Sequence, residues 1–290
     1  WMIAQMEAED GGFFASLDAD TEGEEGKYYV FTDAELDTAL DRSERQALAS
    51  VFHMEPPPNF EERAWHLAGP PDLVPGTQDP IESPSLASGL NHLRALRARR
   101  IRPRRDEKLL VSWNALAVSG LVNAIHAVDP AQDTSAWSVS IDAALDRIYR
   151  DLWHEGRLIA QFCERPGQCE GFLDDYAYLL NALLDALTLT WRDDRLSWAM
   201  SLADRLVEGF EAPESEGGGF YFSSTDHEVL FHRSRSFADD ALPSGNALAA
   251  TALRRLAHSR LARADLGGNG LAHRHGGFRH PRSYRPGQSL

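Results

Sequence analysis

Apolar residues recur at helical spacing along most of the chain after residue 85. The stretch 172–191 is apolar almost all round, which is typical of a helix buried on every side, whereas 137–152 and 195–210 each have one apolar face. Buried helices therefore alternate with half-exposed ones, as in two layers of paired helices. The spacing predicts helices over residues 109–125, 137–152, 172–191, 195–210 and 245–261.

The joints between these helices repeat as well. A glycine turn and a short strand follow each half-exposed helix, at residues 9–14, 155–159 and 217–222. Gly156 and Gly218 lie 62 residues apart, and Asn114, Asp174 and Asp239, which precede the buried helices, are spaced by 60 and 65. A fixed period of this length indicates a repeat of helical hairpins. The predicted fold is all-α: a partial (α/α)6 toroid of the six-hairpin glycosidase-like kind, with short β-hairpins at the helix joints.

The N-terminal third has a weaker pattern. Residues 26–32 predict a short strand, and Asp33 is expected to cap a helix that begins at Ala34. Residues 55–84 contain eight prolines and predict an extended connection, which inside a domain is usually functional or insertional.

Both ends of the sequence are unusual. Residues 1–7 resemble the middle of a helix, so further residues are expected upstream. Residues 266–290 carry four arginines, three histidines and no carboxylate, and they lack a helical period. The toroid domain is therefore predicted over residues 1–265, followed by an irregular tail at 266–290, which an aberrant end of the sequence would explain.

Composition narrows the classes of partner. The net charge of −15, from 29 basic and 44 acidic residues, argues against nucleic acid. No apolar run reaches the ~18 residues of a membrane span. Cys163 and Cys169 match no metal-binding spacing, so a cytoplasmic setting is expected, with no metal and no cofactor.

Polar residues gather in four clusters, at residues 16–26, 105–114, 171–176 and 239–246. The last three open buried helices, whose N-termini would meet at one end of a ring. Carboxylates on opposite sides of such a ring suit acid–base chemistry on a glycosidic bond. The candidate catalytic residues are Asp18, Asp20, Asp174, Asp175 and Asp239. The candidate substrate-binding residues are Trp113, Asn114, Tyr176, Ser244 and Asn246.

Roles within this set follow from the expected pKa values. A carboxylate that accepts hydrogen bonds at a helix N-terminus has a lowered pKa and suits a base, while an acid needs an apolar wall or a second carboxylate nearby. We expect the acid to be Asp174 or Asp175, and the base Asp239, Asp18 or Asp20. For any one of these residues helix capping is the stronger interpretation, because Asp, Ser and Asn are preferred at helix N-termini. No histidine opens a buried helix, which favours a carboxylate enzyme over an epimerase with paired histidines.

Four stretches carry a family resemblance: GGFFASLDADTEGEEGKYYVFT, RPRRDEKLLVSWNAL, GFLDDYAYLLNALL and DDALPSGNALAA. Together they resemble the spermatogenesis-associated protein 20-like family, whose bacterial members are YyaL-type thioredoxin-domain proteins. The resemblance implies a thioredoxin-like domain of the same polypeptide followed by a six-hairpin toroid, of which this chain would hold the middle. Asp240 and Ala247 depart from the family pattern, which more often has Gly and Ser there.

Two functions are compatible with these observations. The first is a carbohydrate-active domain, glycoside hydrolase-like or sugar-isomerising, with a carbohydrate or small-molecule ligand. The second is a non-catalytic helical scaffold of a protein that works through its thioredoxin-like domain in redox chemistry or protein folding.

Overall fold

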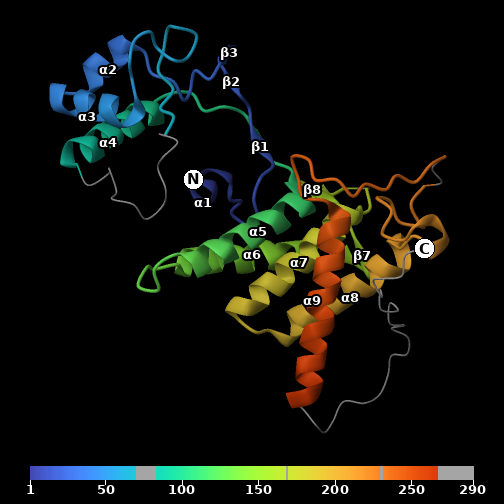
Figure 1. The fold of residues 1–290 in the computed structure, drawn as a ribbon. Helices are drawn as coiled ribbons and strands as arrows, with labels where there is room; N and C mark the ends of the chain where they lie inside the picture. The colour runs from blue at the N-terminus through green and yellow to red at the C-terminus, as the bar shows by residue number, and fades with distance from the viewer. Residues whose placement is uncertain (70–82, 168, 229–230, 267–290) are drawn as a thin grey trace, which may run out of the picture.

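The computed structural model describes residues 1–69, 83–167, 169–228 and 231–266, and the side chains of these residues up to 258. About half of the chain is helical, and the fold is shown in Figure 1. The helices are α1 (Met2–Met6), α2 (Asp33–Ala39), α3 (Arg42–Phe52), α4 (Pro84–Ala98), α5 (Val111–Ala127), α6 (Ser135–Leu152), α7 (Leu173–Leu189), α8 (Asp193–Phe210) and α9 (Gly245–Leu266), with one 3₁₀ turn, η2 (Glu214–Glu216).

The strands are only two or three residues long, and all their pairings are antiparallel. They form the pairs β1–β4, β2–β3 and β6–β7 and the three-stranded sheet β5–β8–β9. A mainly helical fold with short hairpins at the joints is thereby confirmed. The strands are β1 (Ser16–Leu17), β2 (Asp20–Thr21), β3 (Glu24–Glu25), β4 (Arg105–Asp106), β5 (Leu109–Leu110), β6 (Trp153–His154), β7 (Arg157–Leu158), β8 (Gln161–Cys163) and β9 (Arg165–Pro166).

Helix α7 is the centre of the larger core. It packs against α5 on one side and α9 on the other, and it also contacts α8 (Figure 1). Its buried residues lie all around the helix, as predicted, and Leu179 and Leu183 are completely inaccessible to solvent. Helices α6 and α8 bury one face each and leave the other in water. We call α1 and α5–α9 the hairpin unit.

One kind of contact recurs at the three glycine turns of the hairpin unit. In the first, Asn114 of α5 accepts a hydrogen bond from the backbone N of Phe13 (2.6 Å) and donates one to its carbonyl oxygen (3.0 Å). In the third, Asn246 of α9 makes the same pair of bonds with Phe220, at 2.7 and 2.9 Å. In the second, the Tyr176 hydroxyl accepts from the backbone N of Leu158 at 2.9 Å.

Glycine is required at the first of these turns. Gly11 and Gly12 have φ angles of 94° and 78°, in the left-handed region that side chains disfavour. A Cβ on Gly11 would also overlap the backbone of Ala143 on α6. The turn therefore packs its bare backbone directly against the neighbouring helix.

Between the first turn and α5 the chain builds a second unit, residues 18–101, which we call the small lobe. Figure 1 shows its helices α2–α4 set apart from α5–α9. The lobe has its own hydrophobic core, centred on Leu36, Leu48, Leu86 and Trp65. In the other two repeats only a short connection leads from the glycine turn to the buried helix. The small lobe is thus an insertion into the hairpin repeat, which the sequence did not reveal.

Two local predictions in this lobe are wrong. No strand forms over residues 26–32: 26–29 form a turn, and Phe31 makes a single β-bridge with Trp65. The turn follows from the φ of 70° at Gly26 and from Arg100, which donates to the carbonyl oxygens of Lys27 and Val30 at 2.8 and 2.7 Å. The cap of α2 is Thr32 rather than Asp33, in a reciprocal arrangement with Glu35.

Other predictions fall partly outside the described residues. Residues 55–69 are irregular, as expected of the proline-rich connection, whereas 70–82 and the predicted tail after residue 266 are not described. Among the helices that are described, none is long and apolar enough to cross a membrane.

The two cores should respond separately to mutation. Leu48→Ala is expected to destabilise the small lobe by ~2–5 kcal/mol, because Leu48 is buried in that core and a cavity would remain. Hydrogen exchange should then show loss of protection in α2–α4 and retained protection in α5–α9. Leu179→Ala should give the reverse pattern, and equal loss in both units from either change would show a single cooperative core.

Candidate functional site

The N-termini of α5, α7 and α9 lie side by side, as the spacing of the polar clusters predicted. Asp175, in the first turn of α7, accepts hydrogen bonds from the backbone N of Ser112 in α5 (3.0 Å) and of Phe172 (2.9 Å). Tyr178, one turn further along α7, donates its hydroxyl proton to the carbonyl oxygen of Pro243, just before α9. These two side chains fasten three helix N-termini into one polar cluster, which we call the inner-helix cluster.

Asp175 is buried, with 5% of its surface exposed. Burial raises its pKa to about 6, although the hydrogen bonds from Phe172 and Ser112 act in the opposite direction. The prediction that a capping carboxylate in this cluster would have a lowered pKa is therefore wrong for Asp175. Desolvation outweighs the two backbone N–H groups. Each of its oxygens also receives a hydrogen bond within the protein, so Asp175 is a positioning residue.

Asp174 differs from its neighbour. It is half-buried, and no described residue donates a hydrogen bond to its carboxylate. Burial raises its pKa. Its Oδ1 lies against Gly245, the first residue of α9, where any side chain would overlap it. The carboxylate thus lies between the N-termini of α7 and α9.

At the start of α9 the polar residues act as caps. Ser244 accepts a hydrogen bond from the backbone N of Ala247 at 3.4 Å. Asp239 is exposed and accepts from the backbone N of Ser244 at 2.8 Å. Burial, followed by the charges of Asp174, Asp175 and Asp239, raises the pKa of Tyr178 to about 12. The Tyr178 hydroxyl is thus close enough to all three carboxylates for their charges to disfavour its deprotonation.

Three of the predicted substrate-binding residues use their polar groups in hydrogen bonds within the protein. Asn114, Asn246 and Tyr176 are buried and hold the glycine turns. The amide of Asn114 also donates to the carbonyl oxygen of Leu110 at 2.9 Å, and that of Asn246 to Ser236 at 2.9 Å. Neither amide has a free N–H for a ligand in this conformation.

Aromatic surface borders the cluster. Trp113, next to Ser112 in α5, is 44% exposed. Phe222 is 39% exposed and stacks on Phe172, which precedes α7, with ring centroids 4.7 Å apart. The carbonyl oxygen of Phe222 accepts a hydrogen bond from the backbone N of Leu173 at 2.9 Å, which places Phe222 beside the start of α7.

Asp18 and Asp20 are not brought into this cluster. Both are exposed in the stretch between β1 and β3, where Asp18 accepts a hydrogen bond from the backbone N of Asp20 at 3.2 Å. No hydrogen bond or ion pair of the described residues joins either carboxylate to α5, α7 or α9.

Sequence reasoning missed Tyr178 and Phe222. Tyr178 lies four residues after Asp174, so helical spacing places both on one face of α7. That face continues through Asn181, Asp185 and Thr188. It contacts the neighbouring helices, since Asp185 accepts from Ser119 of α5 (2.7 Å) and pairs with Arg255 of α9 (2.7 Å). Phe222 gives no such signal, because its position depends on the fold of the third turn.

Among the residues that the structure describes, no group of His, Cys, Asp or Glu side chains could hold a metal ion. A cavity of about 570 Å³ lies in the small lobe, and none of its lining residues belongs to the inner-helix cluster.

These features define a class of protein: a helical-hairpin repeat with a polar end formed by its inner helices. No family model matches the chain. It is 27% identical to human spermatogenesis-associated protein 20 over 88% of this chain and 37% of that protein. The mouse and rat proteins of that name are 28% and 30% identical over 85% and 59% of this chain. The resemblance predicted from the four motifs is thereby confirmed: the relatives that the chain matches over most of its length bear the name spermatogenesis-associated protein 20.

The chain spans about a third of the length of its human and mouse relatives. Among solved structures, it is similar to cellobiose 2-epimerase from Bacillus thermoamylovorans, with a TM-score of 0.37 and 10% identity over 77% of this chain and 55% of that one. For D-mannose isomerase the TM-score is 0.31, at 14% identity over 71% and 48%. At these scores neither similarity bears on the fold or the function of this chain.

The raised pKa of Asp175 makes stability depend on pH. Its carboxyl titrates near 3.8 when unfolded and at about 6 when folded. Between these values the folded state holds a proton that the unfolded state has lost, so stability falls as pH rises from 4 to 6. At ~1.4 kcal/mol per pKa unit, the loss is about 3 kcal/mol. In the Asp175→Asn variant, the free energy of unfolding measured by urea denaturation should lose this dependence on pH between 4 and 6. The same pH dependence in the variant and the wild type would contradict the assignment.

The contact between Asp174 and Gly245 can be measured as a coupling. In a helix Gly→Ala normally stabilises by up to ~1 kcal/mol. Gly245→Ala should bring little or no gain in the native chain, because the new Cβ would overlap the carboxylate of Asp174. The same change in an Asp174→Ala background should bring the full gain. A coupling energy near zero in this double-mutant cycle would show that the two residues are not in contact.

Proposed function

We propose that this chain is part of an (α/α)6 toroid and that the inner-helix cluster is an acid–base site for a sugar or glycoside. The observation that carries the proposal is the state of Asp174. Its carboxylate is half-buried, has a raised pKa and receives no hydrogen bond from the described residues. The neighbouring Asp175, Asn114 and Asn246 all have their polar atoms bonded within the protein.

Asp194 makes the contrast clear. It is the second residue of α8, as Asp174 is of α7. Its pKa is lowered, chiefly by a hydrogen bond from Arg192, at 2.6 Å from one guanidinium nitrogen. Asp194 is thus stabilised in its charged form by a neighbouring arginine. The buried helix α7 instead places a first-turn carboxylate where its proton is retained more strongly, which a general acid requires.

The chemistry assigns each group a part. Asp174, protonated, gives its proton to the glycosidic oxygen as the bond from that oxygen to the anomeric carbon breaks. A water molecule adds to the anomeric carbon and loses a proton to Asp239, which is exposed and bonded through one oxygen only. Trp113 and Phe222 offer flat apolar surfaces to the sugar ring. A sugar-isomerising reaction would use the same pair of carboxylates to move a proton between carbon atoms.

A specific observation favours a second candidate, the non-catalytic scaffold of a thioredoxin-like redox or folding protein. Most polar residues of the cluster serve as caps or hold turns, including Ser244 and Asp175. On this account Asp174 would have no role beyond its helix.

Activity assays separate the two candidates. The chain is incubated with a panel of disaccharides, aryl glycosides and free sugars, and products are followed by NMR. Asp174→Asn should lower turnover by ~10²–10⁴-fold, the usual contribution of a general acid, with the fold intact by circular dichroism. Asp194→Asn, the matched change on α8, should leave turnover unaltered. Equal turnover in wild type and Asp174→Asn would leave the scaffold as the better account.

A further inference from the structure

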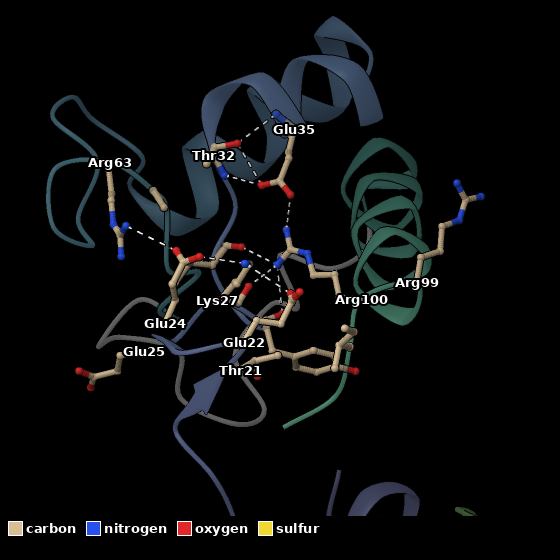
Figure 2. Close-up of a pocket in the computed structure, with 14 residues that line it drawn as sticks. Thr21, Glu22, Glu24, Glu25, Lys27, Thr32, Glu35, Arg63, Arg99 and Arg100 are labelled. Atoms are coloured by element: carbon tan, nitrogen blue, oxygen red, sulfur yellow. Dashed lines mark hydrogen bonds and ion pairs between the residues drawn. The ribbon is translucent and has the colours of Figure 1, made fainter. Parts of the chain in front are cut away.

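The small lobe contains a cavity with a volume of about 570 Å³ (Figure 2). This size is within the range of small-molecule sites. Its walls come from the β2–β3 hairpin, the start of α2, Arg63 and the residues that follow α4. The hairpin belongs to the first polar cluster of the sequence, whose acidic residues have no place in the inner-helix cluster.

The charges that line this cavity neutralise one another. Lys27 Nζ lies 2.8 Å from Glu24 and 3.4 Å from Glu22, as Figure 2 shows. Arg63 lies 3.7 Å from Glu24, and Arg100 lies 2.7 Å from Glu35. Three carboxylates thus face three basic groups. The remaining charged lining residues, Glu25 and Arg99, point away from this network (Figure 2).

The wall is fixed by Arg100, whose side chain is 16% exposed. Its guanidinium donates to the carbonyl oxygens of Lys27 (2.8 Å), Tyr28 (3.1 Å) and Val30 (2.7 Å). It also lies 4.8 Å from the ring centre of Phe31, a cation–π contact. The backbone that carries the cavity wall is therefore held in place before any ligand arrives, which lowers the entropic cost of binding.

Another residue of the wall has an unmet hydrogen bond. Thr21 is 5% exposed, and its hydroxyl finds no partner among the described residues. Buried hydroxyl groups in proteins are normally bonded to protein or to an ordered molecule. The Thr21 hydroxyl is therefore a polar group at the cavity wall whose hydrogen-bonding capacity is not used by the described residues.

We propose that this cavity is a binding site for an uncharged polyhydroxylated ligand, such as a mono- or disaccharide, separate from the inner-helix cluster. Carboxylates provide several acceptor positions each, and Lys and Arg provide donors, so sugar hydroxyls meet partners of both kinds. Because the inward-facing charges are already paired, a charged ligand would gain no net attraction. Tyr28 and Ile101 add apolar surface for the C–H faces of the ring. The site is independent of the acid–base chemistry proposed for α7.

The test measures ligand binding to the whole chain by NMR titration. Cellobiose serves as the uncharged probe, with glucose 6-phosphate and glucosamine as its anionic and cationic counterparts. Cellobiose should bind saturably and shift signals of Thr21, Tyr28 and Arg100, and the charged sugars should bind at least tenfold more weakly. Lys27→Met should weaken cellobiose binding at least tenfold, because it removes donors, leaves Glu22 without the cation it pairs with and leaves Glu24 with only the more distant Arg63.

Lys108→Met is the matched control, since Lys108 is similarly exposed (43% against 39%) and is paired with Asp106 outside the cavity. It should leave binding unchanged. Because Lys27→Met alters the fold of the hairpin if the pairs are structural, Glu24→Gln provides a second variant with the same expected loss. Equal binding in both cavity variants and wild type would overturn the proposal, as would preferential binding of a charged sugar. Loss of binding in Asp174→Asn alone would overturn it in favour of the inner-helix cluster.

Discussion

The hairpin unit depends on the way each inner helix holds the backbone of the preceding glycine turn. Asn114 and Asn246 each bond both the N–H and the carbonyl of the residue that follows a turn, and Tyr176 bonds the N–H of Leu158. These backbone groups are buried, so leaving one unbonded would cost ~1–3 kcal/mol. The contacts fix where each turn sits against the next inner helix. They also explain why polar residues gather at one end of the unit.

The same contact shows at which point of the hairpin repeat the small lobe is inserted. Asn114 reaches back 101 residues to Phe13, whereas Asn246 reaches back 26 and Tyr176 reaches back 18. The contact tolerates the longer sequence separation because it requires only that the two ends of the insertion lie close together. The pairing of β1 with β4 brings them together. Loop-closure entropy grows slowly with loop length, so an insertion with its own core costs the repeat little.

The sequence predicted the hairpin unit well because its signal is periodic burial. Helix α7 is apolar all round and was expected to be central, and the turns at Gly156 and Gly218 were found by their period. The small lobe was not predicted, because α3 is largely polar and the core of the lobe forms from segments far apart in the sequence. Residues 28–31 are of strand-forming types, yet 28 and 29 lie in a turn and the carbonyl oxygens of Tyr28 and Val30 bond Arg100 instead of a neighbouring strand.

The candidate site could be predicted in position but not in detail. Spacing placed Asp174 and Asp175 at a shared end of the inner helices. It could not distinguish the buried, bonded Asp175 from the half-buried, unbonded Asp174, because adjacent helical residues point about 100° apart and only the fold decides what each meets. Asp18 and Asp20 were expected at the same end for a different reason: spacing alone did not show that the chain leaves the hairpin repeat after β1.

The central claim is that Asp174 is kept for function at a cost in stability, and thermal unfolding at pH 7 tests it directly. Its pKa is raised by burial, so the charged form destabilises the folded state despite the favourable helix N-terminus. Asp174→Asn should therefore leave Tm unchanged or higher, whereas Asp194→Asn, which loses its bond to Arg192, should lower it. A clear fall in Tm for Asp174→Asn, equal to or larger than that for Asp194→Asn, would identify Asp174 as a structural residue and contradict the account.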